Sequence, residues 1–374
     1  MGDNDTRSEE FGADGLWNTR RSFLLGAAGV AGIGTTATAA GVLGGDEDED
    51  EDDEDQDGEE GETGGDRDWT PEAHDVTSSD DLRLRVWEQS QGNPVEAVLF
   101  VHGATYGAVS MFDPPVDDDW TSWMDHAAHE GQAAFAIDIR GYGDSERPPE
   151  FEQDPEETDP VVPAAVAASD VRDALHWIRE EQGYDRIHLV GLSSGTWRAR
   201  ALFSNYDPDV ATVTLAAGSL GQFDPPEEDL PAWSTQVRST FEERWRQQVP
   251  EDADPDEWIG GEDYSADEVI DAVWKAIYRS GQRLPDREEE TILNPTNLLQ
   301  DDEHHPEDIT APTLVVCGTS DPLISREGSL RLYDAVGAAD NRKQYAEIAG
   351  GTHFLFLEDR RHELFDVVTE FQRP

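Results

Sequence analysis

Short apolar runs that end in a turn alternate with amphipathic segments along most of this chain, and this alternation limits the possible folds more than any other feature. The strand-like runs cover residues 82–87, 97–103, 133–145, 187–190, 210–218, 311–318 and 343–350. Helical segments lie between or after them, at 165–181, 327–336 and 362–371. The alternation predicts an α/β fold with a mostly parallel central sheet and helices on both of its faces.

One block, residues 220–303, breaks the alternation because it contains no strand-like run. Its clearest segment, 266–281, predicts a helix whose apolar face consists of Val269, Val273, Trp274 and Ile277. The block is also rich in tryptophan. We therefore expect a helical cap, spanning about 221–303, that is inserted between two strands of the sheet.

A glycine–serine turn follows the strand-like run at 187–190. It matches the pattern G-x-S-x-G, as Gly191-Leu192-Ser193-Ser194-Gly195. A chain of this length contains such a pattern by chance in roughly one case in ten, but here a strand precedes it and a helix-compatible stretch follows. We interpret Ser193 as a nucleophile on a sharp strand-to-helix turn, with an ordinary turn serine as the alternative. Ser194 is the weaker candidate nucleophile because it lies off centre.

A serine hydroxyl needs a neighbouring base, and the base needs a carboxylate that orients it. Asp321 follows the run that ends at 318, and His353 follows the run that ends at 350. Both come at the carboxyl ends of predicted parallel strands, where open α/β sheets place their sites. The alternatives are an Asp-Pro turn residue for Asp321 and a surface histidine for His353. Asp224 is a weaker candidate for the acid.

Several motifs, in this order, resemble those of serine hydrolases with the α/β-hydrolase fold. They are FVHGA at 100–104, DIRGYGDSERP at 138–148, VGLSSG at 190–195, GTSDPL at 318–323 and GGTHF at 350–354. The resemblance spans about 82–371. It implies a Ser-Asp-His triad made of Ser193, Asp321 and His353. It also implies an oxyanion hole formed by the backbone N–H groups of Ala104 and Ser194.

The same resemblance assigns structural roles to three other polar residues. His102 belongs to the turn after the first buried strand, and Asp138 and Arg140 belong to a loop that supports the site. Relatives that use an aspartate nucleophile carry it at the position of Ser193. A serine there argues against dehalogenase and epoxide hydrolase reactions.

The first 45 residues resemble a twin-arginine export signal. Arg20 and Arg21 precede a weakly apolar run, 23–43, that is about long enough to span a bilayer. An A-x-A cleavage site is available at 37–39, so both a cleaved, secreted protein and a membrane-anchored one are open. Residues 46–72 are almost wholly acidic or glycine and predict a disordered linker. The hydrolase domain is expected at 73–374.

The chain is strongly acidic, with a formal net charge of -57, and Lys275 and Lys343 are its only lysines. Self-repulsion of this size is largely screened in concentrated salt, and the pattern resembles proteins of haloarchaea. The sequence shows no basic patch, which argues against nucleic-acid binding. Cys317 is the only cysteine, which excludes an intrachain disulfide and a thiolate metal cluster.

These observations predict an exported serine hydrolase that cleaves a small or medium apolar ester through an acyl-enzyme. We expect no metal and no organic cofactor. The partners are a small-molecule ester or amide substrate and the twin-arginine export machinery. Three alternatives stay open: an aminopeptidase of the proline-iminopeptidase kind, a cofactor-free haloperoxidase or perhydrolase, and a binding protein that has kept the fold without turnover.

Overall fold

The computed structural model describes residues 71–116, 122–221, 231–295 and 305–373. The predicted export signal and nearly all of the predicted acidic linker lie outside these residues, as does Asp224. The first described element, the strand β1 (Glu72–Thr77), begins one residue before the expected start of the hydrolase domain. Within the described residues, no helix combines the length and the apolar character needed to cross a membrane.

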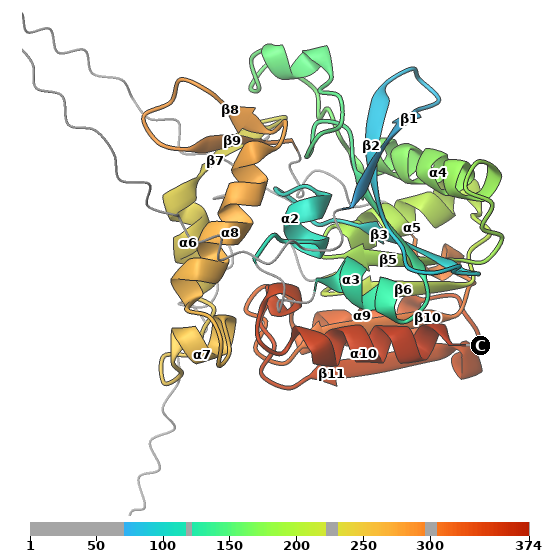
Figure 1. Cartoon of the computed structure of the whole chain (residues 1–374). Coiled ribbons are helices and arrows are strands. Elements are labelled where there is room, and N and C mark those ends of the chain that lie inside the picture. The colour runs from blue at the N-terminus through green and yellow to red at the C-terminus, as the bar shows by residue number, and fades with distance from the viewer. Residues whose placement is uncertain (1–70, 117–121, 222–230, 296–304, 374) are drawn as a thin grey trace, which may run out of the picture.

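An eight-stranded sheet forms the centre of the molecule, in the order β1-β2-β4-β3-β5-β6-β10-β11 (Figure 1). The strands after β1 are β2 (Arg83–Gln89), β3 (Ala97–Val101), β4 (Ala133–Asp138), β5 (Ile187–Leu192), β6 (Thr212–Ala216), β10 (Thr313–Gly318) and β11 (Lys343–Ile348). β2 pairs antiparallel with β1 and with β4, and the other neighbours pair in parallel. The predicted mostly parallel sheet is therefore confirmed.

Helices cover both faces of this sheet, as the alternation predicted. The main helices are α2 (Ala108–Phe112), α3 (Trp123–His129), α4 (Ala164–Glu180), α5 (Gly195–Tyr206), α9 (Arg326–Ala335) and α10 (Arg361–Gln372). Val98 and Phe100 of β3 pack with α2, α3 and α10, whereas Leu99 and Val101 pack with α4, α5 and α9. Successive side chains of a strand point to opposite faces, so each fully buried strand contributes to two cores.

The edge strand β1 was not predicted from the sequence. Its residues read EAHDVT, and only Val76 is buried. An edge strand that carries polar side chains lacks the apolar run by which buried strands are recognised. Its pairing with β2 is therefore a result of the tertiary fold.

The predicted helical cap is inserted between β6 and β10, as expected, but it also contains short strands that the sequence did not predict. It contains α6 (Arg238–Arg246), α7 (Pro255–Ile259) and α8 (Ala266–Arg279). It also contains a small antiparallel sheet, β7-β9-β8, made of Ser234–Val237, Thr291–Asn294 and Arg283–Leu284. In β7 the buried side chains are the polar Ser234 and Gln236. Such short strands with polar inward positions show no apolar alternation.

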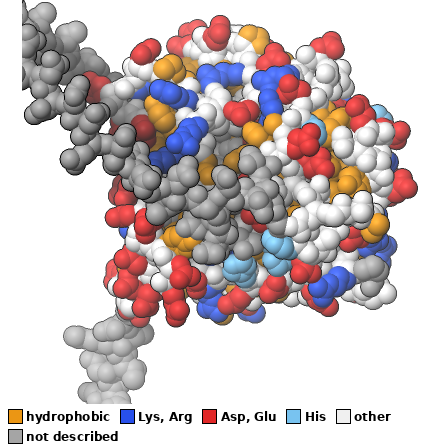
Figure 2. Space-filling model, viewed as in Figure 1, with side chains coloured by type: hydrophobic (Ala, Val, Ile, Leu, Met, Phe, Trp, Pro, Cys, Tyr) orange, Lys and Arg blue, Asp and Glu red, His pale blue; other side chains and the backbone are white. Residues whose placement is uncertain are grey.

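The predicted cap helix is α8. Ser265 caps its N-terminus through a capping box with Glu268. The face that was predicted to be apolar is completely buried, with Val269, Val273, Trp274 and Ile277 each at most 1% exposed. Figure 1 shows the cap to one side of the sheet, facing α2, and the two share one apolar core. Acidic side chains are spread widely over the face in Figure 2.

Candidate active site

Ser193 lies on the turn between β5 and α5 in a left-handed backbone conformation, with φ of 54°. Few residues other than glycine adopt this conformation, and it is strained. The glycines on either side are required because the backbone passes close to them. A Cβ at Gly191 would lie 2.6 Å from the carbonyl oxygen of Gly195, and one at Gly195 would lie 2.3 Å from that of Val101. The pattern G-x-S-x-G thus has a steric basis here.

The three residues predicted to form a triad lie together at the carboxyl ends of their strands. Nε2 of His353 is 2.9 Å from Oγ of Ser193, and Nδ1 of His353 is 2.8 Å from Oδ2 of Asp321. The Asp321 side chain is completely buried, and its Oδ1 accepts the backbone N–H groups of Leu323 and Ile324. A carboxylate in this position fixes the proton on Nδ1, so Nε2 can accept the serine proton.

The backbone of His353 is held from the cap. Its N–H donates to Oε1 of Gln248, a buried residue that follows α6, over 3.0 Å. The next residue, Phe354, stacks on Trp245 of α6 with ring centroids 4.9 Å apart. Cap and histidine loop are therefore one packed unit.

A buried carboxyl group lies behind the same loop. Glu358 accepts hydrogen bonds from Oγ1 of Thr352 over 2.6 Å and from Nε1 of Trp245 over 3.3 Å. Only 1% of Glu358 is exposed, and burial raises its pKa to about 7, against the hydrogen bonds from Thr352 and Trp245. Glu358 thus links the histidine loop to the cap, and its carboxyl group titrates near neutral pH.

The predicted oxyanion donors, Ala104 and Ser194, both line the pocket beside Ser193. The carbonyl oxygen of Gly103 points away from that pocket region, toward Nδ1 of His102 at 2.7 Å and Nη1 of Arg198 at 3.3 Å. In a trans peptide the C=O and N–H point in opposite directions, so the N–H of Ala104 is turned to the other side. Arg198 also donates to the carbonyl of His102, over 2.7 Å.

The buried His102 is neutral in this arrangement. Its Nε2 accepts the N–H of Ile139 over 3.1 Å, so the ring proton is on Nδ1 and is donated to the carbonyl of Gly103. Burial first, and then the charge of Arg198, lower its pKa well below the ordinary value. His102 therefore orients the loop of Ala104.

Asp138 and Arg140 also act within the scaffold. Asp138 accepts hydrogen bonds from the N–H groups of Ala108 and Asp144 and from the indole of Trp87. Arg140 pairs with the buried Asp170 and with the exposed Asp80. Neither residue lines the pocket at Ser193.

Cys317 is buried in β10, and burial raises the pKa of its thiol.

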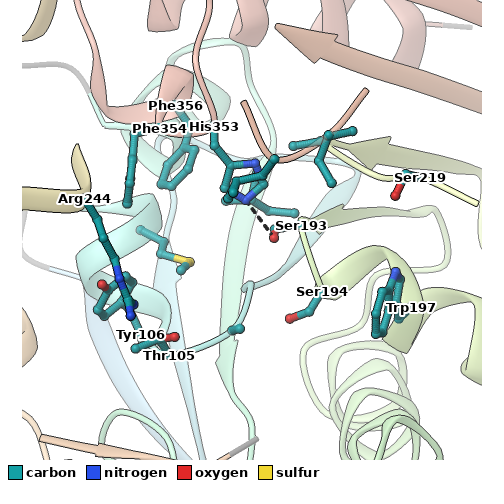
Figure 3. Close-up of a pocket in the computed structure, with 16 residues that line it drawn as sticks. Thr105, Tyr106, Ser193, Ser194, Trp197, Ser219, Arg244, His353, Phe354 and Phe356 are labelled. Atoms are coloured by element: carbon teal, nitrogen blue, oxygen red, sulfur yellow. Dashed lines mark hydrogen bonds between the residues drawn. The ribbon is translucent and has the colours of Figure 1, made fainter. Parts of the chain in front are cut away.

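The pocket around Ser193 is largely apolar (Figure 3). Its apolar walls come from Met111, Leu192, Trp197, Ala217, Leu323, Ile324, Phe354 and Phe356. Figure 3 shows Ser193 and His353 in the middle, with Ser194 and Trp197 on one side and Arg244, Tyr106 and Thr105 on the other. No Asp or Glu is among the described residues that line it. Such walls suit a ligand of mostly apolar character.

One group of side chains elsewhere could hold a metal ion by its composition. Glu72, His74 and Glu88 of β1 and β2 each place a ligand atom within 4.8 Å of the others. His74 and Glu88 are already joined by a hydrogen bond of 2.9 Å. None of the three lines the pocket at Ser193.

The fold and this site define an α/β protein with a serine on a strand-to-helix elbow, a histidine and a buried carboxylate. The chain belongs to the alpha/beta hydrolase fold family, whose model matches residues 96–360.

Solved structures of low sequence identity share this fold. A 2-hydroxy-6-oxo-6-phenylhexa-2,4-dienoate hydrolase from a Rhodococcus strain is 18% identical, covering 82% of this chain and all of its own length, with a TM-score of 0.55. A thioesterase domain from the curacin biosynthetic pathway is 14% identical, covering 80% of this chain and 99% of its own, with a TM-score of 0.54. An esterase from Thermogutta terrifontis is 18% identical, covering 80% and 97%, with a TM-score of 0.51.

Several residues of the site carried no signal in the sequence. Gln248 and Arg244 come from the cap, and their approach to the site depends on how the cap folds back. Glu358 is one of 84 acidic residues, so its burial could not be distinguished. Arg198 could have been noticed, since it lies on the predicted helix after the elbow and an arginine on its buried side requires a polar partner.

Proposed function

We propose that this protein is a serine hydrolase that cleaves an acyl bond, in the first instance a carboxylic ester. The observation that carries the proposal is the continuous hydrogen-bonded series from Ser193 through His353 to Asp321 in an apolar pocket. Membership of the hydrolase fold family supports it.

The proposed reaction has two halves. Oγ of Ser193 attacks the acyl carbonyl carbon while Nε2 of His353 takes the hydroxyl proton, and the oxyanion is stabilised by the N–H groups of Ala104 and Ser194. His353 then gives the proton to the leaving alcohol, which leaves an acyl-enzyme. A water molecule, deprotonated by His353, attacks the acyl carbon and releases the acid, and the proton returns to Ser193. Asp321 holds the imidazole throughout.

The pocket favours an ester over an aminoacyl substrate. An aminopeptidase needs carboxylates that hold the substrate ammonium, whereas the described lining contains no Asp or Glu and does contain Arg244. A perhydrolase would use the same three residues. It is distinguished from an esterase by testing whether hydrogen peroxide replaces water as the group that attacks the acyl-enzyme. A binding protein without turnover would not require the strained backbone of Ser193.

We also propose that the protein is exported by the twin-arginine route and works in concentrated salt. The two arginines before an apolar run support the first part, and the net charge of -57 supports the second. Replacing Arg20 and Arg21 by lysine in an expressing host tests the export. Equal amounts of folded protein outside the cell with either sequence would contradict it.

Labelling with a fluorophosphonate probe in molar salt tests the hydrolase proposal directly. We expect the wild type to be labelled and Ser193→Ala to be unlabelled. Ser194→Ala is the matched control: it should still be labelled, since only its backbone N–H is used. A salt-folded wild type that resists the probe would disprove the proposal. A panel of esters, aminoacyl amides and peroxide then defines the reaction.

A further inference from the structure

A positive charge lies in the wall of this largely apolar pocket. Arg244 of α6 lines the pocket with Thr105 and Tyr106, and it is the only described lining residue with a permanent charge. It is 9% exposed. A guanidinium stays protonated in a protein, although burial lowers the pKa of Arg244. The site therefore keeps a buried cation in a protein whose net charge is -57.

The guanidinium is held in place by a series of hydrogen-bonded side chains. Its Nη1 donates to Oε1 of Gln236 in β7 over 3.1 Å, and Nε2 of Gln236 donates to the hydroxyl of Tyr106 over 2.6 Å. Gln236 is 3% exposed and Tyr106 is 7% exposed. These hydrogen bonds fix the position of the cation before any ligand binds, which lowers the entropic cost of binding.

Tyr106 adds a second donor beside the cation. Its hydroxyl accepts from Gln236 and still has its own hydrogen to donate. Burial raises the pKa of Tyr106 to about 12, so the phenol keeps that hydrogen at neutral pH. Tyr106 is two residues after Ala104, and its N–H donates to the Ala104 carbonyl over 2.9 Å. The two donors thus adjoin the loop that supplies the oxyanion N–H.

From this geometry we propose that Arg244 and Tyr106 form a carboxylate-binding subsite, and that the preferred substrate is an acyl ester whose acyl chain carries a carboxylate. The proposal rests on the proposed hydrolase function and names its substrate class. A guanidinium presents parallel N–H groups that match a carboxylate. One cation among apolar walls suits a monoanion, since a phosphate dianion would require more donors.

Matched pairs of substrates test this subsite. Each pair consists of the mono-4-nitrophenyl ester of glutaric, adipic or pimelic acid and the same compound with its free carboxylate capped as a methyl ester. We expect the wild type to have a higher kcat/KM for the carboxylate of at least one pair. In Arg244→Met the kcat/KM for that carboxylate should fall roughly 10- to 100-fold, as for a lost charge-assisted hydrogen bond, and the capped ester should change little.

Arg246→Met is the matched control, because Arg246 lies on the same helix but pairs with Glu242 and Asp267 at the surface. It should leave both kcat/KM values unchanged. Tyr106→Phe should weaken the preference for the carboxylate without abolishing it. Equal kcat/KM values for the two members of every pair in the wild type, or an equal loss for both in Arg244→Met, would overturn the subsite.

A binding measurement separates this subsite from the hydrolase function. Calorimetric titration of Ser193→Ala with glutarate and with adipate should show binding, and Ser193→Ala/Arg244→Met should show none. If the fluorophosphonate fails to label the wild type but the dicarboxylate binds through Arg244, the hydrolase proposal falls and the subsite stands. If labelling succeeds and neither dicarboxylate binds Ser193→Ala, the subsite falls alone.

Discussion

The side-chain oxygen of Gln248, in the cap, accepts a hydrogen bond from the backbone N–H of His353 over 3.0 Å. The proposed general base is therefore positioned from two sides. Asp321 holds its ring from the sheet, and Gln248 holds its backbone from the insertion. The cap thus helps to position the proposed base and also forms a wall of the pocket.

Removing the amide of Gln248 should reduce turnover more than substrate binding. In Gln248→Leu we expect kcat to fall roughly 5- to 30-fold with little change in KM, since a hydrogen bond of this kind is worth about 1–2 kcal/mol. Gln247→Leu is the matched control, because Gln247 pairs with Glu243 at the exposed surface. Steady-state kinetics on one ester measures both. An unchanged kcat in Gln248→Leu would contradict the positioning role.

The strained backbone at Ser193 should be visible in stability. Glycine adopts φ of 54° without a steric penalty, whereas alanine at this position still carries the penalty of its Cβ. We expect Ser193→Gly to be more stable than Ser193→Ala by about 1 kcal/mol, and both to be inactive. Chemical unfolding in molar salt measures the difference. Equal free energies of unfolding would show that the turn stores no strain.

Arg198 should act through the loop of Ala104. In Arg198→Met the carbonyl of Gly103 loses one partner, so the N–H of Ala104 is less firmly directed at the oxyanion. We expect kcat/KM and the affinity of a boronic acid transition-state analogue to fall together, by up to the roughly 3 kcal/mol of one oxyanion donor. Near-ultraviolet circular dichroism checks that the core is intact. A well-folded variant with unchanged analogue affinity would exclude this role.

Glu358 should make stability depend on pH. Its pKa is raised from 4.5 to about 7 in the folded protein, chiefly by burial, so the folded state binds the proton more tightly than the unfolded state. The contribution to the free energy of unfolding is fully present below pH 4.5 and is lost as the pH rises to about 7, by about 3 kcal/mol at most.

Glu358→Gln mimics the protonated carboxyl and should remove this dependence. The variant should become the more stable protein at pH 8, and its advantage should shrink as the pH falls toward 5. Glu257→Gln, an exposed change on α7, is the control and should follow the wild type. Parallel unfolding curves of wild type and Glu358→Gln across this range would refute the prediction.

Salt should stabilise the folded chain. With a net charge of -57, like charges are brought together on folding, and about 1 M salt reduces the Debye length to about 3 Å. We expect the thermal midpoint to rise steeply from dilute buffer to molar potassium chloride. A midpoint that is independent of salt would argue against adaptation to concentrated salt.

The sequence by itself determined every strand of the main sheet except the edge strand β1, the position of the insertion and the candidate triad. Strands buried on both faces must be apolar, and the turn at Ser193 must have glycines where the backbone passes within contact of it. Such requirements act on neighbouring residues, so they leave local patterns. The places of Asp321 and His353 followed because parallel strands end at one edge.

Only the tertiary structure decided how the insertion contributes to the site. The short strands of the cap bury polar side chains, and Gln248, Arg244 and Gln236 reach the pocket region from positions that are distant in sequence from Ser193. Glu358 and Arg198 differ from the other acidic residues and arginines because each is buried and hydrogen-bonded to a particular partner. Burial and contacts between distant segments depend on tertiary packing, and such packing produces no periodic pattern in the sequence.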